Sequence, residues 1–135
     1  MLRCTGVLAH ARSSIACVTV VLDAADTAYP SIAFSRADKL PLIAYFAHSE
    51  SATGAGGTLN VARCVDHACG SSPRVLSASA HGYDVGKYPH IALDAWGVPS
   101  VAFLNASAAD GGLRWSGAML LRCVDASCTR WRVRR

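Results

Sequence analysis

Short apolar runs recur along the chain, rich in β-branched and aromatic residues and separated by Gly, Pro, Asp and Ser. Runs of this length between turn residues are typical of β-strands. The segment Val7–Ala28 stays ambiguous, because its alanines also permit a helix. Elsewhere the pattern predicts strands at Ser31–Ser35, Pro41–Phe46, Thr58–Cys64, Arg74–Ser79, His90–Asp94, Pro99–Leu104, Ala118–Cys123 and Arg130–Val133.

The chain contains an internal repeat with a period of 59 residues. Tyr29–Phe34 matches Tyr88–Leu93, and the phrase Arg-Cys-Val-Asp-x-x-Cys ends at Cys69 and again at Cys128, with the same offset at both anchors. Equal offsets at two distant anchors indicate a duplicated unit. We therefore predict one repeat domain over residues 1–135, with the end of a preceding unit at 1–28, a first unit at 29–87 and a second unit at 88–135.

The composition agrees with an all-β globular domain. Apolar and aromatic residues make up 52% of the chain and charged residues only 16%, with 11 Gly and 5 Pro. Solvated helices normally carry many Lys and Glu side chains, and this chain has few of either. No apolar run approaches the roughly 20 residues of a membrane-spanning helix, so we expect no membrane span.

The net charge of +4 comes largely from the C-terminal tail. Its arginines alternate with Trp131 and Val133, which is the pattern of a half-buried strand with these two residues facing a core. A basic tail on a nearly neutral domain is weak support for polyanion binding. We predict no nucleic-acid partner.

Six cysteines are unusual for a reduced cytosolic domain, and four of them form two pairs with four intervening residues. Such a pair admits a disulfide across a turn, a pair of metal ligands, or two buried thiols. A tight turn brings the two Cα atoms into disulfide range. Zinc normally takes two to four intervening residues, and the four cysteines with His67 could form one site only if the two cysteine turns met. We favour disulfides, with no metal site, for Cys64, Cys69, Cys123, Cys128, Cys4 and Cys17.

The sequence contains no complete catalytic motif. Sugar hydrolysis needs two positioned carboxylates, and the only glutamate is Glu50. Aspartates recur at turn positions of the repeat, where a short acceptor side chain stabilises the turn. These are Asp38, Asp66, Asp94 and Asp125. We predict no catalytic residue and no cofactor.

The repeat resembles one found in large secreted or surface bacterial proteins, which reads Tyr-Pro-Ser-Ile-Ala, Asp-x-x-Gly-x-Pro-x-Ile-Ala-Tyr and Gly-x-Leu-x-x-Ala-x-Cys-x-Asp-x-x-Cys. The resemblance covers nearly all of Tyr29–Cys128. The chain departs from it in the long loop Ala47–Gly57 and at Ala37–Lys39, which lacks the turn glycine supplied by Gly97 in the second unit.

The resemblance implies a β-propeller-like fold of tandem four-stranded antiparallel blades, in an extracellular or cell-surface protein. The chain would hold about two blades and part of a third. Because a propeller closes with roughly 4 to 8 blades, a homo-oligomer or blades missing from this chain would be needed to complete the ring.

The resulting hypothesis is a non-catalytic scaffold or recognition module, a segment of a larger protein that binds a glycan or protein through its loops, at two variable stretches. These stretches are Ala47–Gly57 and Asn105–Gly117, and the candidate binding residues are Tyr45, His48, Trp96 and Trp115. Two alternatives remain open: a fragment of a propeller glycoside hydrolase or lyase, and a small cysteine-rich zinc-binding module.

Overall fold

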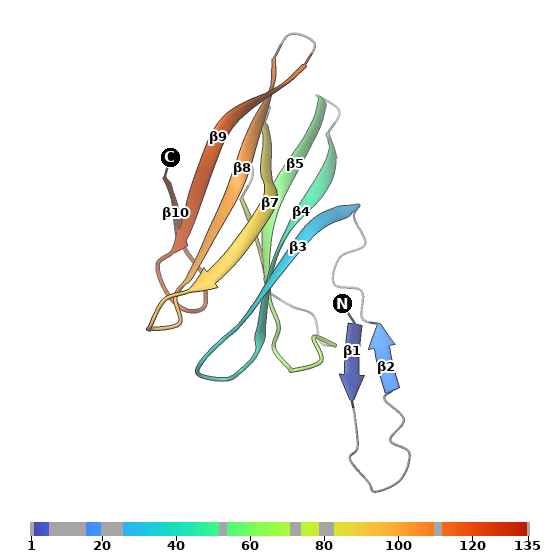
Figure 1. Ribbon diagram of the computed structural model, residues 1–135, viewed down its shortest axis with the longest axis vertical. Coiled ribbons are helices and arrows are strands. Elements are labelled where there is room, and N and C mark those ends of the chain that lie inside the picture. Colours follow the sequence, from blue (N-terminus) through green and yellow to red (C-terminus); the bar gives the residue numbers. More distant parts are fainter. Residues whose placement is uncertain are drawn as a thin grey trace, which may run out of the picture.

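The computed structural model describes residues 2–5, 16–19, 26–51, 54–70, 74–78, 83–109 and 112–134. Every regular element in these ranges is a β-strand (Figure 1). None of the described residues forms a helix that could cross a membrane. The strands are β1 (Leu2–Thr5), β2 (Ala16–Thr19), β3 (Thr27–Phe34), β4 (Pro41–Ser51), β5 (Gly54–Arg63), β6 (Arg74–Ala78), β7 (Tyr83–Leu93), β8 (Pro99–Ala109), β9 (Gly112–Cys123) and β10 (Trp131–Arg134).

The strands form two antiparallel meanders that follow the sequence repeat. The first meander pairs β3 with β4, β4 with β5 and β5 with β6. The second pairs β7 with β8, β8 with β9 and β9 with β10. A single parallel bridge between Gly57 and Asp84 joins the meanders into one open eight-stranded sheet, and β1 and β2 form a separate two-stranded sheet (Figure 1).

The eight expected strands are confirmed, but two expected loops are wrong. In Ala47–Gly57 the ladder of β4 and β5 continues to the pair Ser51 and Gly54. In Asn105–Gly117 the ladder of β8 and β9 likewise continues to Ala109 and Gly112. Ladder hydrogen bonds join backbone groups, so residues of low strand propensity still pair once the register is set.

The turns confirm the role expected of the aspartates. The Asp38 carboxylate accepts a hydrogen bond from the Leu40 N–H, and the Asp94 carboxylate accepts from the Trp96 and Val98 N–H groups. Asp66 and Asp125 accept from backbone N–H groups four residues on. The missing turn glycine is replaced by a strained residue, because Lys39 has φ 58° where Gly97 has φ 79°.

Two of the expected disulfides are present. Cys64 is bonded to Cys69 and Cys123 to Cys128, with Cα atoms 4.9 Å apart in each pair. Cys4 and Cys17 are direct partners in the ladder of β1 and β2, but their side chains lie outside the described residues.

The main core lies between the two meanders. From the first meander it contains residues of β4 and β5, and β7 of the second meander packs against β3, β4 and β5. Ser31 on β3 also accepts a hydrogen bond from the Ile91 N–H on β7. The buried residues of this core are Leu42, Ala44, Leu59, Val61, Val85, Ile91, Val101, Phe103, Leu121, Cys123 and Cys128.

The two meanders come into close contact at Gly86. Gly86 on β7 has φ +102°, and a Cβ atom there would lie 2.6 Å from the Leu59 Cα on β5. Only glycine allows both this backbone conformation and this contact.

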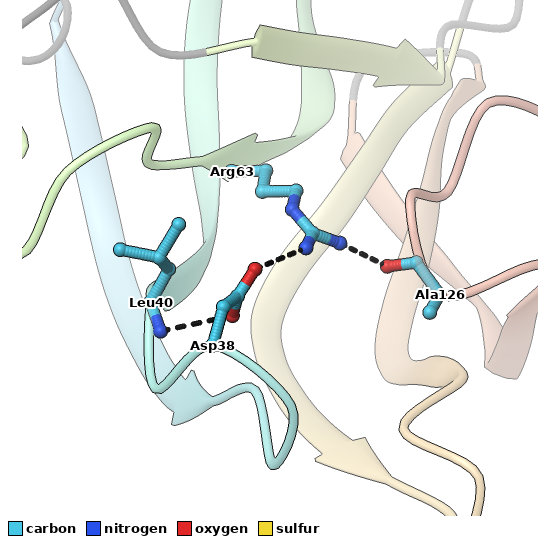
Figure 2. Close-up of polar contacts among 4 residues, drawn as sticks. All are labelled: Asp38, Leu40, Arg63 and Ala126. Atoms are coloured by element: carbon cyan, nitrogen blue, oxygen red, sulfur yellow. Dashed lines mark hydrogen bonds and ion pairs between the residues drawn. The ribbon is translucent and has the colours of Figure 1, made fainter.

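Arg63, at the end of β5, links the meanders through polar contacts (Figure 2). Its guanidinium forms an ion pair with Asp38 at 2.8 Å and donates a second hydrogen bond to the carbonyl of Ala126, in the disulfide loop of the second meander. Its side chain is largely covered.

The expectation that Trp131 and Val133 face a core is wrong. Both are exposed, as are the other residues of β10. In the described part of the chain, β10 pairs only with β9, and the exposure of all four of its residues shows that none of the described residues packs over either of its faces closely enough to bury an alternating pattern.

Candidate binding site around Tyr29 and Tyr88

Two tyrosines at the same position of the repeat sit on strained backbone. Tyr29 has φ 56° and Tyr88 has φ 52°. This region is unfavourable for a bulky residue, and a residue that precedes proline normally avoids it. Each tyrosine lies at a register shift of its ladder, on β3 and on β7. Such irregularities redirect side chains and are frequent at functional sites.

The redirected rings meet each other across the two meanders. Their centroids are 4.3 Å apart with planes tilted by 42°. Hydrogen bonding to the Tyr88 side chain, and then electrostatic repulsion from Tyr88, raise the pKa of Tyr29 above its ordinary value. Tyr29 is 41% exposed and Tyr88 52% exposed, so the pair presents aromatic surface and hydroxyl groups to solvent.

The buried ring of Phe46 packs near this pair of tyrosines. Phe46 on β4 is fully buried, 6.5 Å from the Tyr29 ring. A Cβ atom at Gly57 on β5 would overlap the Phe46 ring, so glycine is needed to admit it. The Lys87 ammonium lies 5.5 Å from the Phe46 centroid, in cation–π range.

His48 extends the site along β4. Its imidazole packs nearly perpendicular to the Phe46 ring, with the centroids 4.7 Å apart, and lies 4.0 Å from the Asp26 carboxylate. The His48 N–H also donates to the Asp26 carbonyl. The His48 side chain is half-exposed and that of Asp26 largely exposed, so both are open to solvent beside the buried Phe46 ring that also lies against Tyr29.

The structure does not bring the four sequence-predicted binding residues together. His48 belongs to the tyrosine site. Tyr45 is three residues away on the same strand, so it points to the opposite face, where it is buried with Ile43 and Cys64. Trp96 lies in the turn after β7 and is 82% exposed. The backbone of Trp115 pairs with that of Ala106, but its side chain lies outside the described residues.

Nothing in the site suggests a metal centre. Among the described residues there is no group of three or more His, Cys, Asp or Glu that could hold a metal ion. The cysteines nearest to a zinc-like spacing are bonded to each other in the two disulfides.

Sequence reasoning missed the tyrosines, although a signal for them was present. Tyr29 and Tyr88 open the best-matched segments of the repeat and each precedes a proline. Polar-tipped aromatic rings that are exposed and rigidly held can stack on a sugar ring or on an apolar side chain while their hydroxyls form hydrogen bonds. The arrangement is suited to contact with such a ligand.

Comparison of the chain with protein-family models, with curated proteins and with solved structures finds no match.

Proposed function

We propose that this chain is a propeller-like repeat segment of a secreted or cell-surface protein, and that it acts as a non-catalytic recognition module for a glycan or a protein. Two four-stranded antiparallel meanders, packed face to face through the first strand of the second, support the propeller-like interpretation. The two disulfides are compatible with an oxidising extracellular compartment.

The observation that carries the recognition proposal is the exposed pair Tyr29 and Tyr88. A bulky residue in the left-handed region costs on the order of 1–3 kcal/mol, and both tyrosines adopt it at the same repeat position. The backbone strain at both Tyr29 and Tyr88 lowers stability, and both rings are exposed. This combination is consistent with selection for binding rather than for stability.

The proposal is tested by glycan-array and peptide-array binding of the oxidised full chain and of two variants, Tyr29→Asn and Tyr88→Asn. Asparagine tolerates positive φ, so each change removes a ring without adding backbone strain. We expect each variant to lose at least about tenfold in affinity for any ligand of the unmodified chain, the loss of roughly 1.4 kcal/mol of stacking.

The matched control is Trp96→Ala, which removes a more exposed aromatic ring from a different part of the molecule. Binding that survives both tyrosine changes and is lost with Trp96 would contradict the tyrosine site and favour the turn after β7. Binding by no array component at all would contradict the recognition function itself.

A further inference from the structure

The two meanders bury equivalent residues to different extents. In the first meander, Ala44 and Val61 lie on the face covered by the second meander, and Val61 is 3% exposed. The residues at the same repeat positions in the second meander are Ala102 and Leu120. Ala102 is exposed, and Leu120 is 42% exposed. We call this the outer face of the second meander, and define it as His90, Ala92, Ser100, Ala102, Leu104, Ala118, Leu120 and Arg122.

The interface within the chain shows what fits such a face. Strand β7 packs across β3, β4 and β5. It contributes the buried Ile91, and Leu93 packs beside it. The interface therefore places the first strand of one meander on the sheet face of the meander before it, and Val101, Phe103 and Leu121 of the next two strands are buried in the same core.

The first strand of the first meander is open at the corresponding residues. Ile32 and Phe34 on β3 are the repeat equivalents of Ile91 and Leu93, and they are 48% and 57% exposed. On the same side of the sheet, Ile43 and Tyr45 of β4 are already buried. We call Ile32 and Phe34 the β3 strip, because they form the open part of this face.

The polar contacts repeat in the same way. Arg63 pairs with Asp38 and donates to the carbonyl of Ala126 in the following meander. Its repeat equivalent Arg122 lies 3.5 Å from Asp94 but is 64% exposed. In another copy of the chain, the carbonyl that corresponds to that of Ala126 belongs to His67, in the first disulfide loop.

We propose that a second copy of this chain docks its β3 strip onto the outer face of the second meander, with Arg122 donating to the His67 carbonyl of that copy. This contact is head to tail, so each chain offers one of each surface and further copies can add until a ring closes. The proposal goes beyond recognition of a glycan or protein and rests only on the packing within the chain.

The association is expected to be weaker than the packing inside the chain. Ala118 stands where the first meander has Leu59, and Ser100 where it has Leu42. Smaller side chains bury less apolar surface. We therefore expect concentration-dependent assembly over about 1–100 μM, the range of weak interfaces.

The test is sedimentation velocity of the oxidised full chain and of Phe34→Asp, Leu120→Asp and Val133→Asp. A carboxylate buried at an apolar contact is costly, so each of the first two is expected to weaken self-association at least about tenfold. Val133 is as exposed as Leu120, at 42%. However, Val133 pairs with Leu121, so both side chains lie on the face of the sheet opposite to that of Leu120. Val133→Asp is therefore expected to assemble normally.

Mixing the two disrupted variants distinguishes this geometry from a symmetric dimer. Phe34→Asp keeps an intact outer face and Leu120→Asp keeps an intact β3 strip, so an equimolar mixture is expected to form a dimer that grows no further. Circular dichroism of each variant checks that it is folded. Sedimentation of the unmodified chain is a test that needs no variant. A monomer at about 100 μM overturns the proposal, as does assembly that Phe34→Asp leaves unchanged or a mixture that stays monomeric.

Discussion

Val61 in the first meander and Leu120 in the second occupy the same place in a 59-residue repeat, yet Val61 is buried and Leu120 is half-exposed. The strand pairing around them is the same, because each lies on the third strand of its meander and pairs with the second. What differs is the neighbour. The first meander has the second packed on it, whereas none of the described residues covers the outer face.

This difference teaches that a repeat unit does not complete its own core. Each meander has two faces and supplies only its own side of each interface, so burial depends on which neighbours are present. Arg63 and Arg122 show the same dependence in polar form, since their side chains are 23% and 64% exposed. Substitutions at equivalent positions should therefore have unequal effects.

The largest effect is expected where the two meanders approach most closely. Gly86→Ala places a Cβ against the Leu59 backbone and a side chain at φ +102°. Backbone atoms cannot move aside as a flexible side chain can, so we expect a loss of more than about 4 kcal/mol in the free energy of unfolding. Urea denaturation followed by circular dichroism measures it.

Gly97→Ala is the control, because Gly97 also has positive φ but nothing lies within 4 Å of the added Cβ. We expect it to cost only about 1–2 kcal/mol, the price of the backbone conformation alone. Equal losses in the two variants would show that strain, and not the contact between meanders, dominates at Gly86.

The next prediction compares Val61 with Leu120, which occupy the same position of the repeat. Val61→Ala leaves a cavity in the core between the meanders and is expected to cost about 2–3 kcal/mol. Leu120→Ala removes a larger side chain, but one that is 42% exposed, so we expect less than about 1 kcal/mol for the dilute monomer. Denaturation of both variants at low protein concentration measures the difference, and a greater loss for Leu120 would mean that the outer face is covered in solution.

The disulfides should contribute almost equally in the two meanders. Both close loops of the same length, with a sequence separation of 5. Loop-closure entropy assigns each about 2 kcal/mol. Replacing Cys64 and Cys69 together by Ala, or Cys123 and Cys128 together, should lower the free energy of unfolding by similar amounts. A loss confined to one pair would indicate that packing around that loop, rather than chain entropy, sets its contribution.

The sequence predicted the elements of the fold better than their extent. Alternating apolar runs and a constant offset indicated both units, and the aspartates were identified as turn formers. The hairpins over 47–57 and 105–117 were missed because their Gly, Ser and Ala residues have low strand propensity. In a hairpin, the register already established by β4 and β5 can extend pairing over such residues.

The candidate site could be predicted only in part, because it forms between segments that are distant in sequence. His48 was identified, but the ring contact between Tyr29 and Tyr88 depends on how the meanders pack. Their positive φ also contradicts the usual preference before proline. Tyr45 and His48 were both proposed as binding residues, although an odd spacing on a strand places side chains on opposite faces.

The smallest predicted effect concerns the stability of the fold at acidic pH. The pKa of Asp38 is lowered to about 2 from 3.8, chiefly by a hydrogen bond from Ser35, then by the Leu40 N–H and by Arg63. The folded chain thus favours the carboxylate, so this contribution is complete above about pH 4 and is lost as the pH falls through about 2. Asp38→Asn should flatten the decline in stability between these two pH values.

Carboxyl NMR titration measures the same property at the side chain itself. Ser35→Ala removes the largest single cause and should raise the pKa of Asp38, and Arg63→Gln, which removes the Arg63 charge, should raise it as well. Ser35 belongs to the first meander's own turn, whereas Arg63 also contacts the second. If Arg63→Gln produced the larger shift, the acid stability of this turn would depend on the contact between meanders, and the turn would not be an independent part of its repeat unit.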